Sequence, residues 1–396
     1  MESLKELYRI GNGPSSSHTI GPKNATIEFI NRYKEMNFDN IKVYLYGSLA
    51  LTGKGHLTDK VIDSVLKGYN HEIIFDINHK TKHPNTMVFK GFKDKKCIIK
   101  MKARSVGGGK IVINKEKYFK EEIYNLNTFD DIKKYCSDKN IRLSDYVDEI
   151  EDINSYLAEV LDTMLKAIDR GLKSKKVIPG GLKLSRKASY LFEKAKDERD
   201  KVMAYAYAVS EENASGNIIV TSPTCGASGV LPSVVKYALD LGKTKDDIIR
   251  GLKTAGLIGN LIKTNASISG AEAGCQAEVG SACSMASVFL AEINNDSIDV
   301  IEKAAEIALE HHLGLTCDPV DGYVQIPCIE RNAVAALRAI DAYNLAKLEE
   351  ELDSRVSFDL ICLTMLATGK DLLSGYRETA KGGLAKYKKK LKKKCR

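Results

Sequence analysis

The segment from residue 270 to residue 293, GAEAGCQAEVGSACSMASVFLAEI, limits the possible folds of this chain more than any other stretch. Alanine, glycine and serine dominate it, and a helix built from it has no polar face wide enough to lie in water. Because small side chains let helix backbones approach closely, the segment predicts a tightly packed, buried helix. Helical patterns also cover most of the chain beyond residue 150, at 152–170, 186–210, 227–241, 245–263, 297–312, 332–350 and 354–375. We therefore predict that this half of the chain is mainly α-helical.

The first 115 residues read differently. Short runs rich in β-branched and aromatic residues, bounded by turn residues, predict strands at 41–47, 71–77, 86–92 and 96–103. Helical patterns occur at 22–34 and 58–68. A charged stretch without periodicity, from about 115 to 150, suggests the domain junction. The predicted fold is an α+β domain over residues 1–150, with a linker from about 115, followed by a mainly α-helical domain over residues 151–396.

The composition is that of a soluble globular protein, with 43% hydrophobic and 28% charged residues in 396. The sequence contains no run of about 18 apolar residues, which is the length needed to span a membrane. The first ten residues, MESLKELYRI, do not resemble a secretory signal. We therefore expect a cytoplasmic protein with no membrane partner.

The net charge of +8 is concentrated at the C-terminus. Residues 381–396 hold eight lysines and one arginine and no acidic residue, so the rest of the chain has a net charge of −1. A basic tail can bind phosphate backbones without specificity, but no nucleic-acid-binding motif accompanies it. We expect no nucleic-acid partner.

Nine cysteines, an odd number, in a chain without an export signal argue against a disulfide framework, and no C-x-x-C pair is present. Cys317 and Cys328 each lie beside a proline in a loop-like region, and Cys275 lies in the segment GAEAGCQAEVG. Thiolate ligands often occur in loops, whereas core cysteines usually lie on apolar helix faces. Spacing alone leaves both a metal or cluster site and simple packing open. Four further cysteines are expected to be structural: Cys97, Cys136, Cys283 and Cys362.

Two glycine-rich stretches are also open to two interpretations. Cys225 lies in TSPTCGASGVLP, a loop that leads into a predicted helix, where it could bind an anion or simply form a tight turn and helix cap. The stretch GNGPSSSHTIGPKN, residues 11–24, could be a structured turn or a binding loop.

Six blocks of the sequence, taken together and in order, resemble the iron–sulfur L-serine dehydratases. They are GNGPSSSHTIGP, YGSLALTGKGHLTD, SVGGG, PTCGASGVLP, GAEAGCQAEVGSACSMA and HHLGLTCDPVDGYVQIPCIERN. The resemblance covers nearly the whole chain and implies a β-type domain followed by an α-type domain in one polypeptide. It also implies dehydration of L-serine to pyruvate and ammonia.

The resemblance assigns a [4Fe–4S] cluster to Cys275, Cys317 and Cys328. Three ligands for four irons leave one iron open, and an open iron can act as a Lewis acid on the serine hydroxyl group. The resemblance also implies that Cys395, next to the C-terminus, can occupy this iron in the resting enzyme.

The remaining site residues follow from the same resemblance. His18 and His56 are the candidates for the base that takes the α-proton of serine, and the sequence does not decide between them. The expected contacts to the substrate come from Ser15, Ser16, Ser17, Ser105 and Thr224. The expected partner is L-serine, and we expect a homodimer.

A related cluster-dependent lyase, such as an L-cysteine desulfidase, is the alternative activity. Such an enzyme would share the three cysteines but would not need the block GPSSSHT or the first domain, so their presence favours serine.

Overall fold

The structure is a computed structural model and describes residues 1–114, 116 and 121–387. It divides into two compact units. Residues 11–120 form the sheet unit, and residues 1–10 together with 121–396 form the helical unit. The two units are described in turn below, each by itself.

The sheet unit contains a five-stranded sheet with the strand order β3-β2-β4-β5-β6. The central β2 pairs in parallel with β3 and antiparallel with β4, and the remaining pairs are antiparallel. The strands are β2 (Asn40–Tyr46), β3 (His71–Asp76), β4 (Thr86–Lys93), β5 (Lys96–Gly107) and β6 (Lys110–Ile113). The four strands predicted from the sequence are confirmed as β2 to β5.

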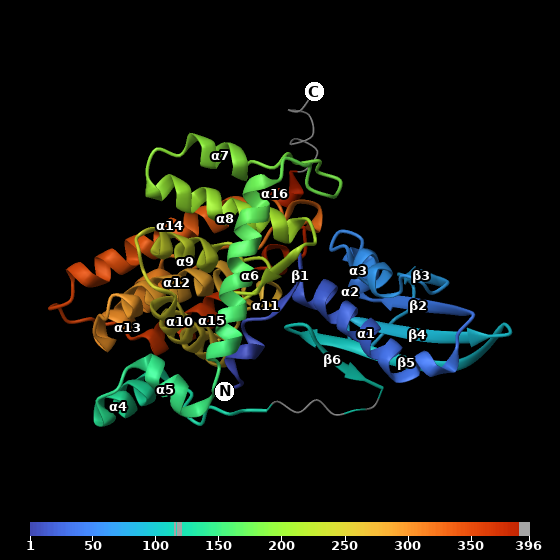
Figure 1. Ribbon diagram of the computed structural model, residues 1–396, viewed down its shortest axis with the longest axis horizontal. Helices are drawn as coiled ribbons and strands as arrows, with labels where there is room; N and C mark the ends of the chain where they lie inside the picture. Colours follow the sequence, from blue (N-terminus) through green and yellow to red (C-terminus); the bar gives the residue numbers. More distant parts are fainter. Residues whose placement is uncertain (115, 117–120, 388–396) are drawn as a thin grey trace. The chain divides into compact units, whose positions relative to one another are not determined.

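One face of this sheet is packed against helices (Figure 1). Alternate residues of β2, namely Ile41, Val43 and Leu45, are fully buried, as the period of two in a strand requires. The helices of the unit are α1 (Gly21–Tyr33), α2 (Ser48–Thr52) and α3 (Thr58–Val65). Phe29 of α1 stacks on Phe89 of β4 with 5.2 Å between ring centroids, and this contact anchors the helix over the sheet.

The helical unit is built around α12 (Ser281–Ile293), in which every residue is buried. Its neighbours are α9 (Val230–Asp240), α10 (Lys245–Asn265), α13 (Ile298–Glu310) and α14 (Cys328–Leu348) (Figure 1). A Cβ atom at Gly251 of α10 would lie 2.5 Å from the Phe289 ring of α12, so only glycine allows this approach. The tightly packed, buried helix predicted from the small residues is confirmed over residues 281–293.

Further helices surround this group, and one short strand, β7 (Ile218–Val220), accompanies them. They are α4 (Phe129–Lys139), α5 (Leu143–Ile150), α6 (Asn154–Lys173), α7 (Ala188–Lys194), α8 (Glu198–Ala214), α11 (Gly270–Ala273), α15 (Phe358–Asp371) and α16 (Gly383–Lys386). The N-terminal segment joins the unit through Arg9, whose backbone N–H donates to Thr221 Oγ1 at 2.9 Å.

The sequence-based expectations need correction at three places. The single helix expected over 186–210 is two helices, α7 and α8, separated by residues 195–197. Residues 129–150, expected to belong to a linker, form α4 and α5. The helix expected over 270–292 is interrupted at Gly274, whose φ of +75° ends α11. A π-helical turn over Gln276–Gly280 then leads into α12. The α+β unit and the mainly helical unit confirm the predicted fold class.

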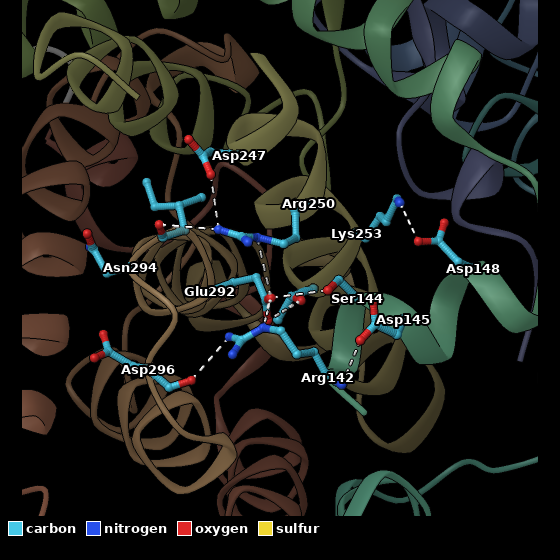
Figure 2. Close-up of polar contacts among 12 residues, drawn as sticks. Arg142, Ser144, Asp145, Asp148, Asp247, Arg250, Lys253, Glu292, Asn294 and Asp296 are labelled. Carbon is cyan, nitrogen blue, oxygen red and sulfur yellow. Dashed lines mark hydrogen bonds and ion pairs between the residues drawn. The ribbon is translucent and has the colours of Figure 1, made fainter. Parts of the chain in front are cut away.

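A buried carboxylate ties α5 to the centre of the helical unit (Figure 2). Glu292 of α12 is completely inaccessible to solvent, and its Oε1 accepts hydrogen bonds from Arg142 Nε at 2.6 Å and Ser144 Oγ at 3.1 Å. Its Oε2 accepts from Thr254 Oγ1 of α10 at 2.9 Å. A buried charge is tolerated when it is paired and hydrogen-bonded in this way, so the network fixes α5 to α10 and α12.

In the described part of the chain, no helix is long and apolar enough to cross a bilayer.

Candidate active-site residues

The serine-rich stretch near the N-terminus forms an ordered turn in the sheet unit. Residues Ser16–Ile20 make a π-helical turn that runs directly into α1, and Ser15 caps it by accepting a hydrogen bond from the His18 backbone N–H at 3.3 Å. Thr19 Oγ1 donates to the His56 carbonyl at 2.9 Å. π-helical turns widen a helix and are frequent at functional sites.

The His18 ring has a partner at each nitrogen. Its Nδ1 is hydrogen-bonded to Ser17 Oγ at 2.8 Å, and its Nε2 to Ser48 Oγ at 2.9 Å. Burial and the nearby His56 lower the pKa of His18 to about 3. The ring is therefore neutral at physiological pH and is held between two serine hydroxyl groups.

His56 is arranged differently. Its Nδ1 lies 3.1 Å from the Thr52 carbonyl oxygen. Because a carbonyl oxygen can only accept, Nδ1 carries the proton and Nε2 carries the lone pair. Burial lowers the pKa of His56 below its usual value. No hydrogen bond to Nε2 occurs within the part of the chain that the structure describes.

The other serines predicted for this unit lie close to the same turn. Ser15 Oγ and Ser17 Oγ are 3.4 Å apart, and the Ser16 carbonyl accepts the Gly21 backbone N–H. Ser105 of β5 packs against Gly21, and its fully buried hydroxyl has no partner among the described residues. The sheet unit thus gathers Ser15, Ser16, Ser17, His18, His56 and Ser105 in one region.

In the helical unit, three cysteines from separate segments come together. Cys275 precedes the π-helical turn, Cys317 lies in a loop, and Cys328 is the first residue of α14. The thiol of Cys317 is hydrogen-bonded to that of Cys275, and this contact and burial raise the pKa of Cys317. Burial, and next the charge at Cys275, raise the pKa of Cys328. Among the described residues, no group of three or more His, Cys, Asp or Glu side chains is placed so that it could hold a metal ion.

Two buried amide side chains fix the backbone around these cysteines. Gln276 Oε1 accepts from the Gly314 backbone N–H at 2.8 Å, and its Nε2 donates to the Met365 carbonyl at 3.2 Å. Asn332 Nδ2 donates to the carbonyls of Cys328 and Gly226, both at 2.8 Å. The loops that carry the thiols are therefore bound to α14 and α15 rather than left free.

Charged residues that the sequence analysis did not identify surround the thiols. Arg331 is hydrogen-bonded to Cys275 and donates to the Thr316 carbonyl at 2.6 Å and to Asp318 Oδ1 at 3.1 Å. Glu278 Oε1 accepts from Thr224 Oγ1 at 2.9 Å. Both Glu278 and Arg331 follow a cysteine by three residues, a helical spacing that places two side chains on one side and that could have identified them.

Two more residues, one in each unit, were missed because their partners are remote in sequence. In the helical unit, Glu378 reaches the thiols through its backbone, since Cys317 N–H donates to the Tyr376 carbonyl and Glu378 N–H to the Cys317 carbonyl, both at 2.8 Å. Desolvation by the surrounding protein, and then Glu278, raise the pKa of Glu378 to about 8. Ser48 is thirty residues from its partner His18. No local sequence signal marks either contact.

The other cysteines divide as follows. Cys225 is buried, and burial and then Glu278 raise its pKa. Cys283 is buried in α12 and donates to the Ala335 carbonyl at 3.4 Å, which fits its expected packing role. Cys136 and Cys362 are buried, and Cys97 is exposed. Cys395 lies outside the described residues.

Two family models match the chain. The model described as serine dehydratase alpha chain matches residues 69–385, and the model described as serine dehydratase beta chain matches residues 3–74. The chain belongs to the serine dehydratase family. It joins both parts in one polypeptide, as the sequence blocks predict.

Curated relatives of this serine dehydratase family member align over nearly their whole length. The L-serine dehydratase of Streptomyces coelicolor is 38% identical over 97% of this chain and 98% of its own. L-serine dehydratase 1 of Escherichia coli is 38% identical over 97% of this chain and 99% of its own. The L-serine dehydratase of Helicobacter pylori strain 26695 is 39% identical over 97% of this chain and 98% of its own. These relatives are lyases, and the resemblance predicted from the sequence is confirmed.

Proposed function

We propose that this chain converts L-serine to pyruvate and ammonia and that it does so with a [4Fe–4S] cluster. The observation that carries the proposal is the meeting of Cys275, Cys317 and Cys328 in the helical unit of a chain with L-serine dehydratases as full-length relatives.

The donor set suits such a cluster. The ligands of a cluster bind different irons, so they need not converge on one point as the ligands of a single ion do. Cys317 and Cys328 both interact with Cys275, and the Arg331 guanidinium beside Cys275 can offset negative charge, which supports this donor set. A cluster held by three cysteines supplies a Lewis acid for the departing hydroxyl group of serine.

In the sheet unit, we assign the removal of the α-proton of L-serine to His56. A base needs a lone pair that is not already used, and Nε2 of His56 has one because Nδ1 donates to Thr52. Both nitrogens of His18 are occupied by Ser17 and Ser48. His18 therefore holds these hydroxyl groups in place, and its own ring stays neutral. Loss of the α-proton and the β-hydroxyl group gives 2-aminoacrylate, which tautomerises and hydrolyses to pyruvate and ammonia.

Contacts to the substrate are assigned to Ser15, Ser16, Ser17, Ser105 and Thr224. The hydrogen-bonded arrangement of Ser15 and Ser17 supports a role in binding the carboxylate, because hydroxyl groups and backbone N–H groups of a tight turn can both donate to an anion. The unpartnered hydroxyl of Ser105 beside Gly21 supports its inclusion.

We assign the position of a fourth ligand in the resting enzyme to Cys395. Leu384 N–H donates to Asp318 Oδ2 at 2.7 Å, which anchors the end of the described chain next to Cys317. The eleven residues that follow Leu384, up to and including Cys395, can span at most about 36 Å, which is ample for a return to the neighbouring thiols. We further propose that the protein is cytoplasmic, that it forms a homodimer and that it has no nucleic-acid partner.

An anaerobic assay tests the activity. Protein purified without oxygen should contain about four irons and four sulfides per chain. It should release pyruvate and ammonia in equal amounts from L-serine. Iron-loaded protein that produces sulfide from L-cysteine and no pyruvate from L-serine would replace the proposal with the desulfidase alternative.

A further inference from the structure

We propose that Glu278 is the residue that binds the α-ammonium group of the substrate, with Thr224 as its partner. This inference rests on the proposed function, because it takes an amino acid as the substrate. It adds a residue that sequence reasoning did not identify, and it selects the amino group as the contact of Thr224.

The first argument is that the Glu278 carboxylate is only partly used. Its Oε1 accepts one hydrogen bond, from Thr224 Oγ1 at 2.9 Å. Among the described residues, no donor to Oε2 and no ion pair to either oxygen is present. The Arg331 guanidinium acts on Glu278 only through its charge, because its hydrogen bonds go to Thr316, Asp318 and Cys275. Burial makes the charged form of the carboxylate costly, and a cation bound at Oε2 would offset more of this cost than Arg331 does.

The second argument is that the two segments packed against this carboxylate present glycines to it. A Cβ atom at Gly226 would lie 3.1 Å from Oε1, and a Cβ atom at Gly270 would lie 2.7 Å from Oε2. Any other residue at Gly270 would therefore crowd the free oxygen. With glycine at both positions, no side chain from these two segments covers the carboxylate.

The third argument is the position of the carboxylate relative to the cysteines. The point that a Gly270 Cβ would occupy is also 3.2 Å from Cys317 Sγ, so the free carboxylate oxygen and this thiol pack against the same glycine. In serine, the ammonium group and the hydroxyl group are on adjacent carbons. A residue that binds the ammonium group should therefore lie close to the residues that would hold the group acting on the hydroxyl, and Glu278 lies close to Cys317.

The chemistry of the pair matches an ammonium group. An ammonium group offers three donors and no acceptor. Glu278 Oε2 can accept one, and Thr224 Oγ1, whose own proton is donated to Glu278, can accept another. The same pair offers no free donor for a carboxylate, so Thr224 is assigned to the amino group of the substrate.

Ligand binding to the iron-loaded protein, measured by rapid mixing so that L-serine is followed before it is turned over, tests the inference. The two probes are L-serine and glycerate, which carries a hydroxyl group in place of the ammonium group. Glu278→Gln should weaken L-serine binding by about 10- to 100-fold, the range for a hydrogen bond to a charged group. Its glycerate binding should change by less than about threefold, and its iron content should match that of the wild type. Glu278→Asp keeps the charge and should retain part of the preference for L-serine.

A control variant and three results decide the outcome. Glu272→Gln, which removes an exposed carboxylate from the same segment, should leave both ligands unaffected. Equal weakening of both ligands, unchanged serine binding, or loss of iron in Glu278→Gln would each overturn the inference. Pyruvate formation by the wild type is read separately. A protein that makes pyruvate but shows no effect of Glu278 refutes the inference alone, and one that prefers L-serine through Glu278 but makes no pyruvate refutes the proposed reaction alone.

Discussion

The imidazole rings of His18 and His56 lie in contact, with 4.7 Å between their centroids and a tilt of 32° between their planes. Two buried rings this close disfavour each other's protonated form, which keeps both neutral. Only His56 retains a ring nitrogen outside the hydrogen bonds of the described residues. The pair therefore has one member suited to accept a proton and one suited to hold its neighbours.

The first prediction separates these two histidines by their kinetics. His56→Gln should lower kcat by about 100- to 10,000-fold, because it removes the general base. Iron content should be unchanged, because His56 belongs to the sheet unit. His18→Gln should lower kcat less, and the exposed His79→Gln serves as control. A His56→Gln protein with wild-type turnover would remove the assignment of the base.

The second prediction concerns the pH dependence of stability. Since the pKa of His18 falls to about 3 in the folded protein, the unfolded chain binds more protons than the folded one below its ordinary pKa of 6.5. The free energy of unfolding therefore decreases as the pH falls from about 6.5 towards 3, by up to about 1.4 kcal/mol per pH unit for this group. His18→Gln should reduce this slope relative to the wild type. Urea unfolding at several pH values measures it, and equal slopes in the two proteins would contradict the buried neutral state.

Much of the fold could be predicted because burial leaves a mark on local sequence. The β-branched run around Val43 identifies a strand whose alternate residues are buried, and the small residues around Ser284 identify a helix that is buried along its length. The helices α4 and α5 were not recognised, because their charged residues obscure the few apolar positions, such as Phe129 and Val147, that face the core.

The site was predictable only in part, for a related physical reason. Cysteines and histidines are rare enough to be noticed singly, so Cys275 and His56 stood out. Ser48 and Glu378 owe their positions to contacts with residues that are distant in sequence. The break at Gly274 depends on a positive φ that a helical pattern does not reveal. Such features follow from tertiary packing rather than from local preference.

The third prediction tests the buried network of α12. Glu292→Gln removes a fully buried charge whose partner Arg142 is 30% exposed. Breaking a buried ion pair costs about 3–5 kcal/mol, and partial exposure of Arg142 places the expected loss of unfolding free energy near the lower end, at about 3 kcal/mol. Glu310→Gln, an exposed carboxylate with 53% of its side chain accessible, should change stability by less than about 0.5 kcal/mol. Similar stability of Glu292→Gln and the wild type would show that the network is not required.

The fourth prediction concerns the ligands of the cluster. The variants Cys275→Ser, Cys317→Ser and Cys328→Ser should each reduce the iron content from about four per chain to near zero. Each should also abolish activity, because a hydroxyl group is a poor ligand for these irons. Cys283→Ser is a matched control, since Cys283 is equally buried and a serine there could still donate to the Ala335 carbonyl. Loss of iron in Cys283→Ser with full iron in Cys317→Ser would overturn the ligand assignment.

The fifth prediction concerns Cys395 on its lysine-rich tail. Neighbouring lysines favour the thiolate form that iron binds. A ligand on the same chain acts at a high effective concentration, so even a weak contact would be occupied until the substrate competes. Wild-type enzyme should therefore show a lag after mixing with L-serine, and Cys395→Ser should remove the lag, keep its iron and lose activity faster in air. The anchor at Asp318 offers a second variant: Asp318→Asn removes the carboxylate that holds Leu384 N–H and should shorten the lag without removing it. An unchanged lag and an unchanged rate of inactivation in Cys395→Ser would show that the tail does not reach the cysteines.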